Sequence, residues 1–164
     1  MPHKKTVLVL MGVSGCGKTE VGQLLAKKLD YPFFDGDDFH PAANIEKMSS
    51  GTPLNDDDRK EWLIQLNQLS RKHRENGAVI ACSALKNNYR GLLRAGMGNC
   101  MAFVYLEGSF ELIKSRLEQR KGHFMPIKLL QSQFDTLEPP TKEITVSIDQ
   151  TPSKIVAEIL KHIN

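Results

Sequence analysis

The sequence is poor in the features that mark secreted, membrane-bound or nucleic-acid-binding proteins. It has only 3 cysteines in 164 residues. Cys16, Cys82 and Cys100 show neither the pairing of a disulfide scaffold nor the CxxC spacing of a zinc site, which fits a reducing compartment. The net charge is only +3, too small a bias to suggest a nucleic-acid or membrane partner. No apolar run approaches the ~18 residues of a membrane span, and the run after Lys5 is too short for a secretion signal. We therefore expect one cytoplasmic globular domain over residues 1–164.

Short apolar runs alternate with helix-length amphipathic segments along the chain. Thr6–Met11 is almost continuously apolar, as expected for a strand covered on both faces. Val21, Leu24, Leu25 and Leu29 then recur at helical spacing and predict one buried helix face. The other predicted strands are 32–34, 78–82, 101–106 and 144–148, and the other predicted helices are 61–74, 110–119, 129–137 and a terminal helix from 152. This alternation predicts an α/β fold with a parallel sheet, in which ligands bind beyond the carboxyl ends of the strands.

A glycine-rich segment directly follows the first predicted strand. It reads Gly12, Val13, Ser14, Gly15, Cys16, Gly17, Lys18 and Thr19, and it fits the pattern GxxxxGK[ST] in full. Glycines allow turns that aim backbone N–H groups at a phosphate, and the following helix adds the positive end of its dipole. Lys18 is expected to reach the β- and γ-phosphates, and the Thr19 hydroxyl to ligate Mg²⁺. Because the motif lies between a buried strand and an amphipathic helix, we interpret it as a nucleoside triphosphate site rather than a bare glycine turn.

Carboxylates follow the second predicted strand as Asp35, Asp37 and Asp38. Asp35 and Asp37 stand two residues apart and point the same way if the backbone is extended. One could hold Mg²⁺ through water while the other accepts the proton of a substrate hydroxyl, which is most of what phosphoryl transfer asks of a base. An acidic solvated turn would have the same composition, but the position beside the phosphate loop favours a functional pair.

A basic segment follows the fourth predicted strand, with five basic residues against one acid between Lys114 and Lys128. Arg116 and Arg120 stand four residues apart, on one face of a predicted helix. A mobile lid that carries these arginines over the triphosphate would neutralise charge on the transferred phosphoryl group. A solvated basic helix end is the alternative, but beside a phosphate loop the pattern favours a lid over about residues 116–130.

Other classes of nucleotide-binding protein fit less well. The guanine-reading NKxD string and the DxxG switch of GTPases do not occur. A motor ATPase would usually carry an acidic pair after a core strand, whereas the third predicted strand ends in Cys82, Ser83 and Ala84. A nucleotide-gated binding module without transfer activity stays open as an alternative, and turnover that depends on an added polyol would exclude it.

Several longer strings stand out beside the phosphate loop. They are Asp35-x-Asp37-Asp38-x-His40-Pro41, Gly51-x-Pro53-Leu54-Asn55-Asp56-x-Asp58-Arg59, Cys82-Ser83-Ala84-Leu85-Lys86, Gly122-His123-Phe124-Met125-Pro126 and Gln133-Phe134-x-Thr136-Leu137-Glu138-Pro139-Pro140. Together they closely resemble the gluconokinase family of P-loop kinases, from about Val7 to the C-terminus, and the details look closest to animal members. The phosphate loop is shared by many enzymes, whereas the strings that contain Arg59, Lys86 and His123 are more diagnostic.

The resemblance implies a nucleoside-monophosphate-kinase-like fold with strand order 2-3-1-4-5. It implies ATP and Mg²⁺ as co-substrates, and D-gluconate as the small-molecule substrate that is phosphorylated at its 6-hydroxyl. It also implies a homodimer. Matched residue by residue, Asp37 would take the proton of the gluconate hydroxyl, and Asp35 would lie nearer the metal. Arg116 and Arg120 match the lid arginines of the family.

On the acceptor side, the resemblance implies that Arg59 and Lys86 face an acidic sugar and that His123 is a candidate substrate contact. The chemistry agrees, because an arginine can bind a planar carboxylate through two N–H groups. An ion pair between Arg59 and Asp56 or Asp58 would explain the arginine equally well.

Shikimate kinase is the nearest rival enzyme, because it also has a phosphate loop, two aspartates after the second strand and an arginine near Arg59. It would be expected to present Gly-Gly-Gly after the third strand, where this chain has Cys82-Ser83-Ala84. A nucleoside-monophosphate kinase fits less well, since its acceptor site should read a base and a phosphate. His40 and Trp62 are interpreted as structural residues.

Overall fold

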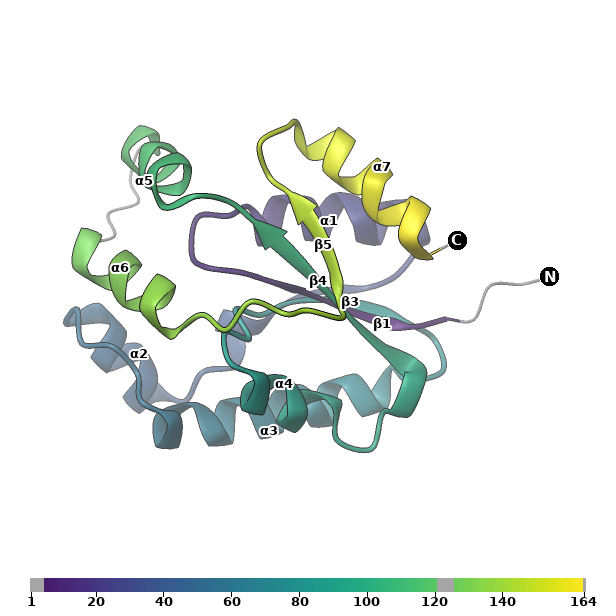
Figure 1. The fold of residues 1–164 in the computed structure, drawn as a ribbon. Helices are drawn as coiled ribbons and strands as arrows, with labels where there is room; N and C mark the ends of the chain where they lie inside the picture. Colours follow the sequence, from purple (N-terminus) through teal and green to yellow (C-terminus); the bar gives the residue numbers. More distant parts are fainter. Residues whose placement is uncertain (1–4, 121–125, 164) are drawn as a thin grey trace.

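Five parallel strands form a single sheet in a computed structural model that describes residues 5–120 and 126–163 (Figure 1). The strands are β1 (Val7–Met11), β2 (Phe33–Asp35), β3 (Ala78–Ala81), β4 (Met101–Glu107) and β5 (Ile144–Ser147). Their order is β2-β3-β1-β4-β5, and every neighbouring pair is parallel. Both the predicted α/β class and the strand order implied by the resemblance are confirmed.

Helices cover both faces of this sheet and extend beyond one edge of it. They are α1 (Lys18–Leu29), α2 (Ala42–Ser49), α3 (Asp56–Lys72), α4 (Asn87–Arg94), α5 (Phe110–Gln119), α6 (Ile127–Thr136) and α7 (Pro152–Ile163), with short 3-10 turns η1 (Gly36–Phe39) and η2 (Gly98–Cys100). In Figure 1, α1 and α7 lie on one face and α3 and α4 on the other. The helices α2, α5 and α6 lie beyond the carboxyl ends of the strands, and both ends of the chain lie on the opposite side.

The core forms around the central strand. All five residues of β1 are buried, since β1 has a strand on either side and helices above and below. Trp62 and Leu66 of α3 are buried on one face of the sheet, and Leu25 of α1 on the other. Fully burying one such side chain contributes roughly 1.5–3 kcal/mol. The prediction for Leu24 was wrong: it is 37% exposed, because the buried stripe of α1 is centred on Val21, Gly22, Leu25 and Ala26.

Three helices differ from the sequence expectation, and one of them, α4 (Asn87–Arg94), was not among the predicted ranges. The helix predicted from Glu61 begins at Asp56 instead, because Asn55 and Asp58 form a reciprocal capping box that starts it before its apolar stripe. The helix α2 was not predicted, since its eight residues bury only Asn44.

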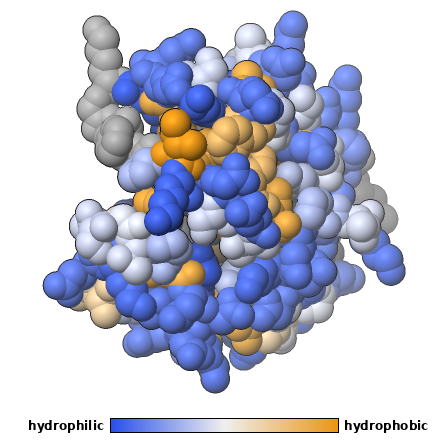
Figure 2. All heavy atoms as spheres, turned by 60° about the vertical axis from the view of Figure 1, so that its left-hand side comes forward, coloured by the Kyte–Doolittle hydropathy of each residue, from blue (hydrophilic) through white to orange (hydrophobic). Residues whose placement is uncertain are grey.

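The face of the molecule at the carboxyl ends of the strands is largely polar. Figure 2 shows the side that carries the carboxyl edge as mostly hydrophilic, with hydrophobic atoms in small groups between charged side chains. Within residues 5–120 and 126–163, no helix has the length and apolar character needed to cross a bilayer.

Candidate active site

The phosphate loop connects β1 to α1 at the carboxyl edge of the sheet. Gly12, Gly15 and Gly17 have φ angles of 148°, 86° and 97°, where any other residue is strained. A Cβ atom at Gly12 would lie 2.8 Å from the Cys16 Sγ atom, so the loop can close this tightly only around glycine. Lys18 is the first residue of α1, and its Nζ donates to the Gly12 carbonyl oxygen at 2.9 Å. Lys18 therefore lies against the loop that is expected to bind the phosphates.

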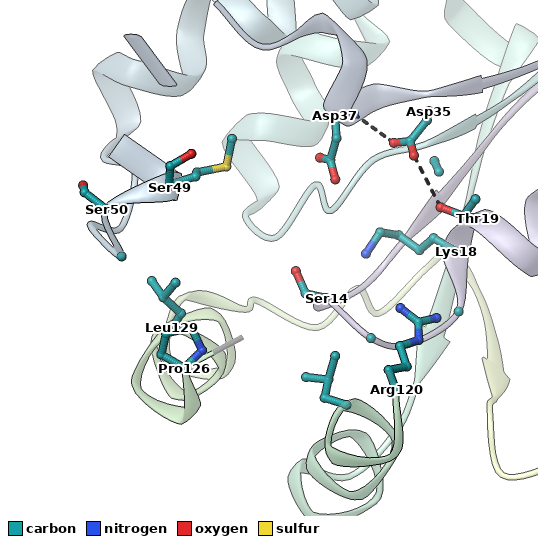
Figure 3. Close-up of a pocket in the computed structure, with 16 residues that line it drawn as sticks. Ser14, Lys18, Thr19, Asp35, Asp37, Ser49, Ser50, Arg120, Pro126 and Leu129 are labelled. Atoms are coloured by element: carbon teal, nitrogen blue, oxygen red, sulfur yellow. Dashed lines mark hydrogen bonds between the residues drawn. The ribbon is translucent and has the colours of Figure 1, made fainter. Parts of the chain in front are cut away.

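The predicted carboxylates lie beside this loop, as Figure 3 shows. Asp35 is the last residue of β2, and Asp37 follows in η1. The Thr19 hydroxyl donates to Asp35 Oδ2 at 3.4 Å, and the Asp37 backbone N–H donates to Asp35 Oδ1 at 3.0 Å. Asp35 is thus fixed between the start of α1 and the turn that carries Asp37. The structure brings together the three oxygen-bearing side chains that the sequence selected for the metal and the base.

The Asp37 carboxylate opens into a cavity of about 800 Å³. Its side chain is 79% exposed. In Figure 3 it faces the Lys18 ammonium across this opening. Neighbouring parts of the chain desolvate the carboxylate in part, which raises the pKa of Asp37; the charge of Lys18 lowers that pKa, and the negative charges of Asp35 and Asp38 raise it. A carboxylate with a raised pKa is a better proton acceptor than a free aspartate.

A second, smaller cavity of about 150 Å³ adjoins the first and shares Ser14, Lys18 and Asp37 with it. It is also lined by Arg59. Asp37 therefore lies where the cavity of the phosphate loop meets a cavity with an arginine in its wall. This is the arrangement that phosphoryl transfer to an anionic acceptor requires, with the donor on one side of the carboxylate and the acceptor on the other.

Arg59 and Lys86 are joined through Tyr89 of α4, to which the sequence analysis assigned no role in the site. Arg59 Nη1 donates to the Leu54 carbonyl oxygen at 2.6 Å and to the Tyr89 hydroxyl at 3.0 Å. The Tyr89 hydroxyl in turn donates to Asp56 Oδ1, which also accepts from Lys86 Nζ at 3.1 Å. The tyrosine and lysine hydrogen bonds lower the pKa of Asp56. The sequence left open an ion pair between Arg59 and Asp56 or Asp58. In the structure Asp56 pairs with Lys86 instead, and Arg59 donates to a tyrosine hydroxyl and a carbonyl oxygen.

The two predicted lid arginines lie near the phosphate loop, but not on one helix face. The helix α5 ends at Gln119, and Arg120 follows in an extended conformation, so the predicted four-residue helical spacing is wrong. Arg116 Nη2 donates to the Ile148 carbonyl oxygen at 2.6 Å. Both arginines line a third cavity of about 380 Å³ beside the phosphate loop, and Arg120 also lines the first cavity, of about 800 Å³. His123 lies outside the described residues, as does the middle of the predicted lid.

Gln133 of α6 is a contact of the phosphate loop that the sequence did not indicate. Its Oε1 accepts from the Ser14 backbone N–H at 2.6 Å, and its Nε2 donates to Ser14 Oγ at 3.0 Å. The two residues are 119 positions apart, and the string that begins at Gln133 carried the family resemblance without indicating this contact. Gln133 also lines the smaller cavity, so it links the loop to the acceptor side.

Two cysteines lie near the site, and burial limits the reactivity of their thiols. Cys16 and Cys82 are buried free thiols. Burial raises the pKa of Cys82 to about 12, so its thiol is not a nucleophile at neutral pH.

Comparison with known proteins shows which family the chain resembles. The family model for shikimate kinase matches residues 14–164. The probable gluconokinase of Xenopus tropicalis is 48% identical, over 93% of this chain and 90% of that protein. The thermoresistant gluconokinase of Escherichia coli (strain K12) is 47% identical, over 97% of this chain and 94% of that protein.

The chain belongs to the gluconokinase family. A crystal structure of a gluconokinase from Sinorhizobium meliloti 1021 superposes with a TM-score of 0.91 at 42% identity, over 99% of this chain and 93% of that one. Shikimate kinase from Acinetobacter baumannii shares the fold, with a TM-score of 0.60 at 19% identity. The family resemblance stated from the sequence is confirmed, and the chain is an ATP-dependent small-molecule kinase.

Proposed function

We propose that this member of the gluconokinase family transfers the γ-phosphoryl group of ATP to the 6-hydroxyl of D-gluconate, giving 6-phospho-D-gluconate and ADP. The observation that carries the proposal is the place of Asp37, between the phosphate-loop cavity and a smaller cavity with Arg59 in its wall. The high identity to gluconokinases along almost the whole chain supports the choice of acceptor.

On the donor side, residues Gly12–Thr19 hold the triphosphate. Backbone N–H groups of the loop and the N-terminus of α1 bind phosphate oxygens, and Lys18 leaves its carbonyl contacts to pair with the β- and γ-phosphates. Asp37 then accepts the proton of the attacking hydroxyl. Positioning and charge stabilisation do most of the remaining work in phosphoryl transfer.

The residues at Thr19 and Asp35 fit Mg²⁺. A hydroxyl oxygen and a carboxylate oxygen lie 3.4 Å apart beside the phosphate loop, and both are the hard oxygen donors that Mg²⁺ prefers. Within the described residues no cluster of three or more His, Cys, Asp or Glu side chains could hold a metal. Such a cluster is not needed, because Mg²⁺ in kinases is usually held by one or two protein groups, phosphates and water. When bound, Mg²⁺ would neutralise phosphate charge.

On the acceptor side, Arg59 binds the gluconate carboxylate. Its Nη1 is occupied by Leu54 and Tyr89, which fixes the plane of the guanidinium and leaves the other N–H groups for a ligand. Lys86 adds positive charge beside Tyr89, whose ring centre lies 5.6 Å from the lysine Nζ and 5.3 Å from the arginine Cζ. His123 stays a proposed substrate contact on the resemblance alone.

Arg120 and Arg116 are proposed to act on the triphosphate. Arg120 lines the same cavity as Lys18 and Asp37, so its guanidinium can approach the transferred group when the lid over about residues 116–130 closes. Arg116 is held by Ile148 beside the loop, where its charge favours the bound polyphosphate.

The resemblance also supports a homodimer in the cytoplasm. Light scattering after size-exclusion chromatography tests the assembly directly: a mass of twice 18.4 kDa is expected, and a single-chain mass at all concentrations would contradict it.

The test of the proposed function is a coupled ADP-release assay with ATP and Mg²⁺. D-gluconate, shikimate, AMP and no acceptor are compared at equal concentrations. Turnover only with D-gluconate is expected, because gluconokinases are 47–48% identical to this chain along almost its whole length, whereas the solved shikimate kinase is only 19% identical. Turnover with another acceptor would contradict the substrate assignment but would still support a kinase. ATP binding without turnover on any acceptor would favour a nucleotide-gated binding module.

A further inference from the structure

A buried imidazole lies behind the proposed base. The Nε2 atom of His40 is 3.7 Å from Asp37 Oδ1, and the side chains are 3% and 79% exposed respectively. Both residues line the smaller cavity together with Arg59. Because the Asp37 side chain is so exposed, packing does little to fix its rotamer. A nearby donor of fixed direction would do so.

The neighbours of His40 determine which ring nitrogen carries its proton. The Asn44 side-chain nitrogen Nδ2 lies 2.8 Å from the Asp58 carbonyl oxygen and 3.2 Å from His40 Nδ1. A carbonyl oxygen can only accept, so the group that faces Asp58 must be the NH₂ of the amide. Its second hydrogen then points at Nδ1, which must be unprotonated. The proton of a neutral His40 therefore lies on Nε2, the nitrogen that faces Asp37.

The ring is held in place as well as in one tautomer. His40 stacks on Trp62, with ring centres 4.1 Å apart and planes 17° from parallel. Trp62 Nε1 donates to the carbonyl oxygen of Gly36 at 2.7 Å, the residue just before Asp37. One tryptophan thus fixes both the imidazole and the backbone that carries the carboxylate.

His40 is uncharged at neutral pH. Burial and the Arg59 charge lower the pKa of His40 to about 4. A neutral N–H donor can orient a carboxylate and weakens it as a base less than a cation would.

We infer that His40 is a positioning residue for the phosphoryl transfer: its Nε2–H, fixed by Asn44 and Trp62, directs the Asp37 carboxylate toward the acceptor hydroxyl. This inference rests on the proposed role of Asp37. The 3.7 Å separation is longer than a hydrogen bond, and a small rotation of the exposed Asp37 side chain is enough to close it.

Two substitutions distinguish the effect of the His40 N–H donor from the effect of its ring packing. His40→Phe keeps the stack on Trp62 but has no N–H. His40→Gln restores an N–H donor toward Asp37 and an acceptor for Asn44. With D-gluconate, kcat of His40→Phe is expected to fall about 10- to 100-fold, as for a misplaced catalytic group, while the KM for ATP stays unchanged. His40→Gln should recover most of the loss.

A matched control and a double-mutant cycle show whether His40 acts through Asp37. His73→Phe makes the same change in an imidazole that contacts Phe34, and kcat should not change. In an Asp37→Asn background, His40→Phe should cost less than about twofold, because the group that it positions is already gone. An equal loss in both backgrounds, or wild-type kcat for His40→Phe, would overturn the inference.

A measurement without any acceptor distinguishes a failure of this inference from a failure of the proposed function. Nitrogen-15 NMR of the wild-type imidazoles at pH 7 should show His40 protonated at Nε2 and bare at Nδ1, with Asp37→Asn shifting the Nε2 signal. A proton on Nδ1, or no response to Asp37→Asn, would overturn the role of His40 even if D-gluconate is the acceptor. A wild-type protein inactive on D-gluconate would instead contradict the proposed function, and the NMR result would still decide His40.

Discussion

At the scale of single residues, the chemistry depends on side chains whose surroundings differ sharply within a few positions of the sequence. Asp35 is tied by the Thr19 hydroxyl and the Asp37 backbone, whereas the Asp37 carboxylate is open to two cavities. A tethered carboxylate suits a metal ligand, and an open one with a raised pKa suits a base.

Asp37→Asn is therefore expected to lower kcat about 10²- to 10⁴-fold, the usual contribution of a general base. ATP affinity should change little, because the phosphate loop is intact. Initial rates and calorimetric titration with ATP measure the two effects. Asp38→Asn is the matched control, with the same loss of charge one residue away, and should stay near wild type. Wild-type kcat for Asp37→Asn would show that the base is another group.

Arg59→Ala tests whether Arg59 binds the carboxylate of the acceptor. Loss of a charged hydrogen bond costs about 1.5–3 kcal/mol, so the KM for D-gluconate should rise about tenfold to a hundredfold while the KM for ATP changes little. The exposed neighbour Lys60 provides the control variant Lys60→Ala. If both Michaelis constants rose equally, Arg59 would be supporting the fold of the site rather than the acceptor.

At the scale of elements, the strands were predicted and the start of one helix was missed. Buried strands such as β1 are continuous apolar runs, which a sequence shows directly. The start of α3 has three consecutive aspartates, poor helix formers whose acidic charge suits the first turn. Its capping box, Asn55 with Asp58, was visible in the sequence and would have placed the start correctly.

Contacts between elements account for what the sequence could not predict in the site. Lys18, Thr19, Asp35 and Asp37 follow from local motifs at strand ends. The bonds from Gln133 to Ser14 and from Tyr89 to Asp56 join residues 119 and 33 positions apart. They depend on where α6 and α4 pack, and no short motif records that.

The end of α5 gives a prediction for Arg120. Because Arg120 follows the helix in an extended conformation and lines the large cavity, Arg120→Ala should lower kcat by at least about tenfold and weaken ATP binding less. Arg74→Ala, at an exposed arginine just beyond α3, is the control. Single-turnover rates and ATP titrations measure the two effects. An unchanged kcat would show that Arg120 does not stabilise the transition state.

At the scale of the whole molecule, the buried His40 links stability to pH. Its pKa is about 4 in the folded state, against an ordinary value of 6.5. Between these values the unfolded chain takes up a proton that the folded chain does not, so the free energy of unfolding falls as the pH falls from about 6.5 to about 4, by up to roughly 3 kcal/mol.

Urea denaturation at several pH values tests this slope. The wild type should lose stability across that window, and His40→Gln should show a shallower slope, since glutamine does not titrate. Equal slopes for both proteins would mean that other groups set the acid sensitivity. Well above pH 6.5, His40 is neutral in both the folded and the unfolded chain, so its contribution to the free energy of unfolding should no longer change with pH.

The parallel sheet places the working edge and the ends of the chain on opposite sides of the molecule (Figure 1). The strand β1 starts at Val7 on the amino edge, and α7 returns there after β5 to end at Ile163. A tether, an affinity tag or a fused partner at either end therefore projects away from the cavities. The protein can be immobilised on a sensor surface through either terminus with its substrate entrance facing the solution.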